Sequence, residues 1–260
     1  MIKYIQHSII FLLIFSVTNS ENNQSAKCRY DNKVIIIKYA KYLERKLDTT
    51  KANKINNRLA KFNKRIEETS KEISFRLIIY EDKSIFKQDL IMHADNENEI
   101  FAKLAGSIGG TKGVFYINKN DSTCINEKNI RDTSYNVRFD LNKWKITKET
   151  KLINDFVCFK AISEEIVEGG IAEGKKNVIT AWFTAELPSF FGPASYYGLP
   201  GTILEVSNGS ITLNATNIEF NEDVDKRIEF PKITETITEN EFQEKARELA
   251  PKRFRKKSRK

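Results

Sequence analysis

The sequence predicts an α+β fold built on a mainly antiparallel β-sheet. First, short segments in which apolar and polar residues alternate follow one another along most of the chain. Second, the segments between them are short, which suits antiparallel neighbours and not the long crossovers that parallel strands need. Third, two or three segments repeat apolar residues every three or four positions, the spacing of helices that cover a sheet.

The clearest helix is expected over residues 51–71. Its apolar residues are spaced by four, three and four positions and form one stripe: Ile55, Leu59, Phe62 and Ile66. This stripe predicts an amphipathic helix packed on the sheet. A short helix is expected near 97–104, and a C-terminal helix over 239–250, where Pro251 ends it.

Strands are expected wherever β-branched and aromatic residues alternate with polar ones. Residues 151–166 and 177–184 flank a glycine-containing connection and predict a long hairpin. Asn208-Gly209 between two apolar runs is the strongest signal for a short hairpin. The remaining strands are expected at 34–39, 73–79, 85–86, 114–117, around Cys124, at 135–139 and at 144–146.

The N-terminus predicts a cleavable secretory signal peptide over residues 1–20. Lys3 precedes an apolar run over 9–17, and small residues Thr18 and Ser20 lie before a cut at Glu21. The run is too short to cross a bilayer, which needs ~20 residues. We therefore expect an exported protein whose residues 21–250 form one domain.

The net charge of +8 does not indicate a nucleic-acid-binding protein. Lys3 leaves with the signal peptide, and seven basic residues lie in the last nine positions, so the rest of the chain is neutral. Residues 251–260 therefore form a basic tail. Such a tail suits contact with an anionic membrane surface, and the alternative is a solvated, disordered end.

Three cysteines, Cys28, Cys124 and Cys158, allow one disulfide in an oxidising compartment. Cys124 and Cys158 both lie in expected strands that could approach each other. We predict a Cys124–Cys158 bridge, with two buried free thiols as an equally weighted alternative.

Most catalytic chemistries lack the residues they require. After removal of the signal peptide, His93 is the only histidine, so a His-rich zinc site or a well-supported catalytic triad is not expected. The glycine cluster at 106–113 lacks the Gly-Lys-Ser/Thr order of a phosphate loop and predicts a turn. Carboxylate pairs such as Glu164-Glu165 are common on surfaces. We expect no enzyme, no metal and no cofactor.

The segment 181–205 stands out because prolines and glycines prescribe its backbone path while aromatic side chains crowd it. It has two interpretations: its aromatic residues plug the end of the sheet, or they form a rigid apolar lip for a ligand. The candidate residues for either role are Trp182, Pro188, Phe191, Gly192, Pro193, Tyr197, Gly198, Leu199, Pro200 and Gly201.

The same segment carries a family resemblance. Gly192-Pro193 and the run from Tyr197 to Glu205 resemble the signature of the GLPGLI family of exported Bacteroidota proteins, with Thr202 where the signature has Leu. Matching stretches begin at Trp144, so the resemblance covers about residues 140–207. It implies a place in the periplasm or cell envelope of a Gram-negative bacterium, no enzymatic activity, and a curved half-barrel sheet like that of lipoprotein carriers.

Three functions are compatible with these features. The first is a periplasmic module that binds or carries an apolar ligand or peptide, and it is the one we expect. The second is an interaction partner of an outer-membrane protein, without a ligand cavity. The third, and weakest, is a hydrolase that uses carboxylates. A large apolar cavity beneath Trp182 would favour the first function, and a filled core with an exposed aromatic patch would favour the second. Two carboxylates that face each other in a cleft would favour the third.

Overall fold

A computed structural model describes residues 30, 33–44, 54–89, 96–166, 176–222, 229–231, 233 and 235–249, without the side chains of 54–59 and 96–99. The predicted signal peptide, the basic tail, Cys28 and His93 lie outside the described residues. None of the described helices is long and apolar enough to span a membrane.

The described elements are twelve strands, three α-helices and one 3₁₀ helix. The helices are α2 (Lys54–Glu72), α3 (Asn96–Ser107), η1 (Ile108–Gly110) and α4 (Glu239–Leu249). The strands are β1 (Val34–Leu43), β2 (Ser74–Tyr80), β3 (Lys83–Gln88), β4 (Val114–Asn118), β5 (Thr123–Ile130), β6 (Thr133–Arg138), β7 (Lys145–Ile153), β8 (Phe156–Ile166), β9 (Lys176–Thr184), β10 (Thr202–Ser207), β11 (Ile211–Asn221) and β12 (Thr236–Ile237).

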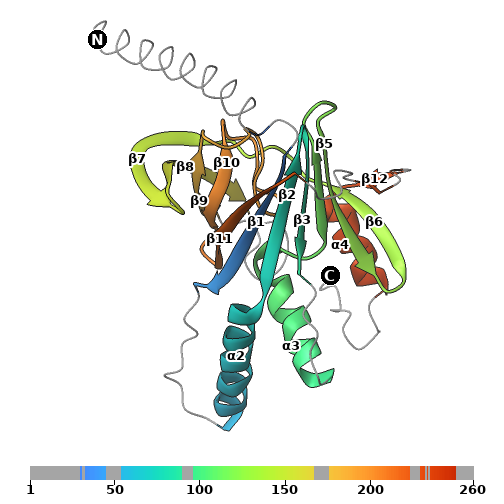
Figure 1. The fold of residues 1–260 in the computed structure, drawn as a ribbon. Helices are drawn as coiled ribbons and strands as arrows, with labels where there is room; N and C mark the ends of the chain where they lie inside the picture. Colours follow the sequence, from blue (N-terminus) through green and yellow to red (C-terminus); the bar gives the residue numbers. More distant parts are fainter. Residues whose placement is uncertain are drawn as a thin grey trace, which may run out of the picture.

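All twelve strands form one curved sheet in the order β12-β6-β5-β4-β3-β2-β1-β11-β10-β9-β8-β7 (Figure 1). Each neighbouring pair is antiparallel except β12 and β6, which are parallel. The predicted α+β class with a mainly antiparallel, curved sheet is thus confirmed.

The alternation of buried and more exposed residues in the central strands explains why the sheet forms. In β1, Ile35, Ile37 and Tyr39 are fully buried, while Ile36 and Lys38 between them are partly exposed. β2 repeats this pattern, with its buried residues on the same face as those of β1. The Tyr39 hydroxyl, although buried, donates a hydrogen bond to the Ile203 carbonyl at 2.5 Å, which compensates the loss of its contact with water.

The helices lie where the sequence predicts them, but the amphipathic helix has an additional partner. Figure 1 shows α2 and α3 next to each other at one end of the central strands, and α4 beside β6. Ile66 of α2 packs on the core, whereas Phe62 contacts Phe101 of α3 with ring centroids 5.3 Å apart. The apolar stripe of α2 is therefore shared between the sheet and α3.

One predicted strand is wrong. Residues 151–166 do not form a single strand, because Asn154 and Asp155 turn the chain between β7 and β8. Both residues have positive φ, 47° and 65°. Asn and Asp tolerate this conformation better than other non-glycine residues, so the pair closes a tight hairpin. The predicted hairpin at Asn208-Gly209 is confirmed between β10 and β11.

Candidate functional site

The loop between β9 and β10, residues 185–201, carries most of the site residues predicted from the sequence. It is packed into the protein. Phe191, Gly192, Pro193, Tyr197, Leu199 and Gly201 are buried, and Pro188, Gly198 and Pro200 are partly exposed. The loop closes on itself, since the Phe190 amide donates to the Leu199 carbonyl at 2.9 Å and the Gly198 amide donates to the Phe190 carbonyl at 3.0 Å. Its burial supports the interpretation of the loop as a plug.

A continuous series of aromatic contacts joins this loop to the central sheet. Tyr197 contacts Phe190 of the loop and Phe139, with ring centroids 5.2 and 5.4 Å apart. From Phe139 the series runs through three sheet residues at 5.4–5.9 Å: Phe115, Phe86 and Phe75. Trp144 adds a hydrogen bond of 2.7 Å from its indole to the Tyr197 carbonyl. Such contacts fix the loop against the sheet.

Trp182, which lies on β9, has different surroundings from the buried loop residues. Its neighbour Phe183 is fully buried, whereas Trp182 is partly exposed and points to the opposite face of β9. The ammonium groups of Lys151 and Lys160 lie 4.5 and 5.9 Å from its ring centroid. Lys151 also pairs with Glu205 at 2.7 Å. Trp182 therefore belongs to a network of ion pairs and cation–π contacts on the sheet surface.

The predicted Cys124–Cys158 bridge is wrong, and both residues are buried free thiols. Cys124 lies on β5 and Cys158 on β8, and seven other strands lie between these two in the sheet. Burial raises the pKa of the Cys158 thiol to about 12 and also raises that of Cys124. A buried thiol with a raised pKa is a poor nucleophile, so neither suits catalysis.

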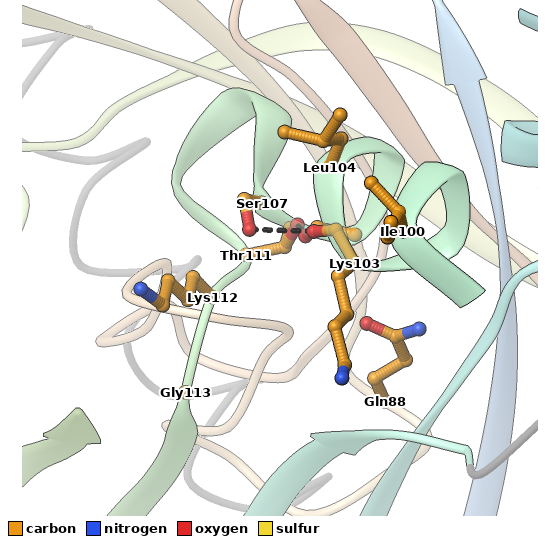
Figure 2. Close-up of a pocket in the computed structure, with 9 residues that line it drawn as sticks. Gln88, Ile100, Lys103, Leu104, Ser107, Thr111, Lys112 and Gly113 are labelled. Carbon is orange, nitrogen blue, oxygen red and sulfur yellow. Dashed lines mark hydrogen bonds between the residues drawn. The ribbon is translucent and has the colours of Figure 1, made fainter. Parts of the chain in front are cut away.

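A pocket of about 420 Å³ opens where α3 ends (Figure 2). Its apolar part is formed by Ile100 and Leu104, which are one turn apart on α3 and remain 57% and 41% exposed. Its polar part is formed by Gln88, Lys103, Gly106, Ser107, Thr111, Lys112 and Gly113. Figure 2 shows Lys103 extending toward Gln88, with Lys112 on the other side of Ser107 and Thr111. This volume falls in the range of small-molecule sites, ~300–1,000 Å³.

Lys41, which is 0% exposed, supports one wall of this pocket from inside. Its ammonium donates to the Ala105 carbonyl at 2.8 Å, the Ile108 carbonyl at 2.5 Å and the Thr111 hydroxyl at 2.8 Å. These groups end α3 and form the following turn, where helix carbonyls have no partner within the helix. Burial lowers the pKa of Lys41 to about 7, while the three acceptors favour its charged form.

The carboxylates considered for hydrolysis are engaged with neighbours. Glu164 pairs with Lys176 at 3.3 Å, and the Asn177 amide donates to Glu165 at 3.3 Å. Within the described part of the chain, no group of three or more His, Cys, Asp or Glu side chains could hold a metal ion.

The sequence did not predict the pocket, although it drew attention to residues 106–113, which form part of the pocket wall. The cluster at 106–113 was predicted to be a turn before a strand, and that prediction is confirmed by η1 and the start of β4. The prediction did not place Lys41 beneath this turn, because 64 or more residues separate Lys41 from its acceptors. An inward-facing lysine at an alternating position of β1 was the available signal, since buried lysines require partners.

Comparisons with known proteins match the chain in part. A family described as "Protein of unknown function (Porph_ging)" matches residues 144–205, which include Trp182 and the whole loop at 185–201. This match is consistent with a family from Bacteroidota. No curated protein sequence matches the chain.

Two solved structures resemble part of the fold. One is described as "Structure of PNGF-II in P21 space group", with 17% identity and a TM-score of 0.48 over 82% of this chain. The other is "Structure of PNGF-II in C2 space group", with 18% identity and a TM-score of 0.45 over 74% of this chain. The aligned region spans 32% and 28% of those chains, so this chain corresponds to about a third of their length or less.

Proposed function

We propose that this chain is a non-catalytic binding protein of the cell envelope that holds an apolar ligand in the pocket at the end of α3. The observation that carries the proposal is the pocket itself, where two large aliphatic side chains stay exposed beside a cavity of ligand size. Export through the predicted signal peptide and the GLPGLI resemblance are the basis for the proposed location.

Because the loop is packed into the core, the ligand is placed at α3 and not behind the loop. A carrier that kept its ligand behind the loop would need space beneath aromatic side chains such as Phe191 and Tyr197. Both are buried in the core together with Leu199. The loop therefore serves the stability of the sheet, and ligand contact is assigned to Ile100 and Leu104.

The chemistry of the pocket supports binding rather than catalysis. The lining residues that the structure describes contain hydroxyl, amide and ammonium groups, and among these described residues there is no carboxylate, thiol or imidazole. An aliphatic ligand would gain about 0.8 kcal/mol for each methylene group that it buries there.

The proposal is tested with a neutral apolar fluorophore, N-phenylnaphthylamine, which brightens when it leaves water. Binding to the full mature chain should be saturable, and the probe should be displaced by alcohols from octanol to dodecanol. Each added methylene should improve displacement about fourfold, the equivalent of about 0.8 kcal/mol. Unsaturable binding, or displacement that ignores chain length, would contradict a pocket for an aliphatic chain.

Two matched variants locate the site. Ile100→Ser removes an exposed apolar side chain from the pocket and should weaken probe binding. Leu152→Ser removes one on β7, which is 70% exposed and does not line the pocket, and should leave binding unchanged. Equal effects of the two substitutions would indicate non-specific surface binding.

A second candidate function, interaction with an outer-membrane protein, is favoured by one specific observation. Leu152 and Val157 face each other across the β7–β8 hairpin, and both are exposed. A contiguous exposed apolar patch marks a protein contact, and this pair would form part of one. Under this hypothesis Leu152→Ser would disrupt partner capture in envelope extracts, and Ile100→Ser would not.

A further inference from the structure

We infer that the turn after α3 is a cation site built from oxygen atoms, and that the side-chain ammonium of Lys41 is the cation that it holds. This inference goes beyond the proposed function, because it concerns the turn behind the pocket and not the ligand within it. It is carried by four oxygen atoms that meet at one buried nitrogen.

The four oxygen atoms surround the Lys41 nitrogen at short distances. The carbonyls of Ala105, Gly106 and Ile108 lie 2.8, 3.3 and 2.5 Å from it. The Thr111 hydroxyl lies 2.8 Å from it. An ammonium group has three N–H donors, so four acceptors exceed the hydrogen bonds that it can donate one to one. The arrangement is therefore that of oxygen atoms around an ion, as when carbonyl oxygens replace the hydration shell of a potassium ion.

The local sequence explains why these oxygen atoms converge. The last carbonyls of a helix have no partner within the helix and carry its partial negative charge. Gly109 and Gly110 both have positive φ, 77° and 81°, so the chain turns after α3 and Thr111 returns to the Gly106 carbonyl. The Thr111 hydroxyl donates its own proton to that carbonyl at 2.5 Å, which leaves its lone pairs for the ammonium.

Lys41 reaches this point from the buried face of β1. It lies two residues after Tyr39, on the same face, and it is 0% exposed. Its nitrogen also lies 5.5 Å from the centre of the Phe75 ring. A buried ammonium is unfavourable unless partner atoms replace water, and buried oxygen atoms need a donor for the same reason. An apolar side chain of similar length could fill the space of Lys41, but it would remove a donor from all four oxygen atoms.

The same atoms adjoin the pocket. Gly106 and Thr111 hold Lys41 and also line the cavity at the end of α3. The cation therefore fixes the position of this wall, and for that consequence alone the inference rests on the proposed function. An empty cation site should loosen the wall and weaken binding of the apolar probe.

The test replaces the tethered cation by a free one. Lys41→Ala removes the side chain beyond Cβ, and propylammonium has the carbon chain and ammonium group of the part removed. Thermal denaturation of the full mature chain is followed by circular dichroism in neutral buffer, with propylammonium chloride or sodium chloride at equal ionic strength. At about ten times its dissociation constant, propylammonium should raise the folded-to-unfolded ratio of Lys41→Ala about tenfold. 1-Propanol, which fills the same space without a charge, should not.

Matched controls separate this site from general effects. The parent protein has its site filled by Lys41 and should not respond to propylammonium. Leu199→Ala also truncates a buried side chain, in the loop at 185–201, and should respond no more than the parent. If Lys41→Ala is unfolded in buffer alone, we expect its native circular dichroism to return with propylammonium and not with 1-propanol.

Each outcome decides one claim. Equal effects of propylammonium and 1-propanol on Lys41→Ala, or no effect of either, would overturn the cation site and leave the proposed function standing. An equal response of Leu199→Ala would also overturn the cation site, because a general salt effect would then explain the result.

Probe binding tests the link to the pocket. Binding of N-phenylnaphthylamine should be weak in Lys41→Ala and should return with propylammonium. Rescue of stability without recovery of probe binding would overturn the role of the cation in the pocket wall. Absence of saturable binding in the parent protein would overturn the proposed function, while rescue of stability in Lys41→Ala would still support the cation site.

Discussion

A series of three glycine-to-alanine substitutions tests how the loop is built into the sheet. Gly110 and Gly198 both have positive φ, 81° and 90°, and Gly201 does not. A Cβ at Gly110 would meet nothing within 4 Å, one at Gly198 would lie 2.1 Å from the Leu141 side chain, and one at Gly201 would lie 2.0 Å from the Thr184 carbonyl oxygen. The series therefore separates backbone strain, displacement of a side chain and displacement of backbone.

The expected losses of stability follow from these contacts. Gly110→Ala should cost only the left-handed backbone strain, ~1–2 kcal/mol. Gly198→Ala should cost that amount plus ~0.5–1.5 kcal/mol for moving Leu141, which is 54% exposed and can rotate away. Gly201→Ala should cost ~3 kcal/mol or more, because Thr184 is a buried, paired residue of β9.

Urea denaturation followed by circular dichroism measures the three differences, provided that the m-value stays constant. The predicted order of destabilisation is Gly201→Ala, then Gly198→Ala, then Gly110→Ala. A stability of Gly201→Ala within ~0.5 kcal/mol of the parent would refute the close approach of the loop base to β9.

Three further predictions concern buried residues. Leu199→Ala should destabilise the protein by ~2–5 kcal/mol, because Leu199 is 2% exposed and its truncation leaves a cavity. Urea denaturation measures this loss, and an unchanged midpoint would contradict the interpretation of the loop as a plug. The unfolded chain should bind the Lys41 proton more tightly than the folded chain, so stability should rise above about pH 7 by up to ~1.4 kcal/mol per pH unit. The measurement stays below pH ~8.5, where the cysteines of the unfolded chain begin to lose their protons and oppose this rise. Lys41→Met should flatten this rise in urea midpoints, and identical pH profiles for the two proteins would argue against it. In a Cys28→Ser chain, intact-mass analysis with iodoacetamide and no reductant should find no adduct in the folded state and two after unfolding; absence of adducts after unfolding would indicate a disulfide.

The sequence predicts local structure well here because the signals are local. The spacing of Phe62 and Ile66 predicts α2, and Asn208-Gly209 predicts the β10–β11 hairpin. The prolines and glycines of 181–205 predict a prescribed backbone path, and Gly198 takes a positive φ of 90°, which glycine adopts readily. The division of 151–166 escaped prediction because apolar residues flank Asn154-Asp155 on both sides and hide the turn.

The candidate site depends on contacts between distant parts of the chain. The pocket needs β3, α3 and the segment before β4 to meet, and Lys41 of β1 to lie beneath them. The periodicity of apolar residues predicts single helices and strands, but it does not predict which of these distant segments come into contact. The cysteines illustrate the same limit, because strand assignments alone could not show that β5 and β8 lie far apart in the sheet order.

The most direct test of the pocket is photo-crosslinking with dodecanol that carries a diazirine at its methyl end. After irradiation of the mature chain and proteolysis, mass spectrometry identifies the labelled peptide. We predict labelling in the peptide that contains Ile100 and Leu104, and its loss when unlabelled dodecanol is in excess. Competable labelling of the loop around Phe191 and Tyr197, or of the β7–β8 hairpin, with none on α3, would contradict the assignment of the binding site.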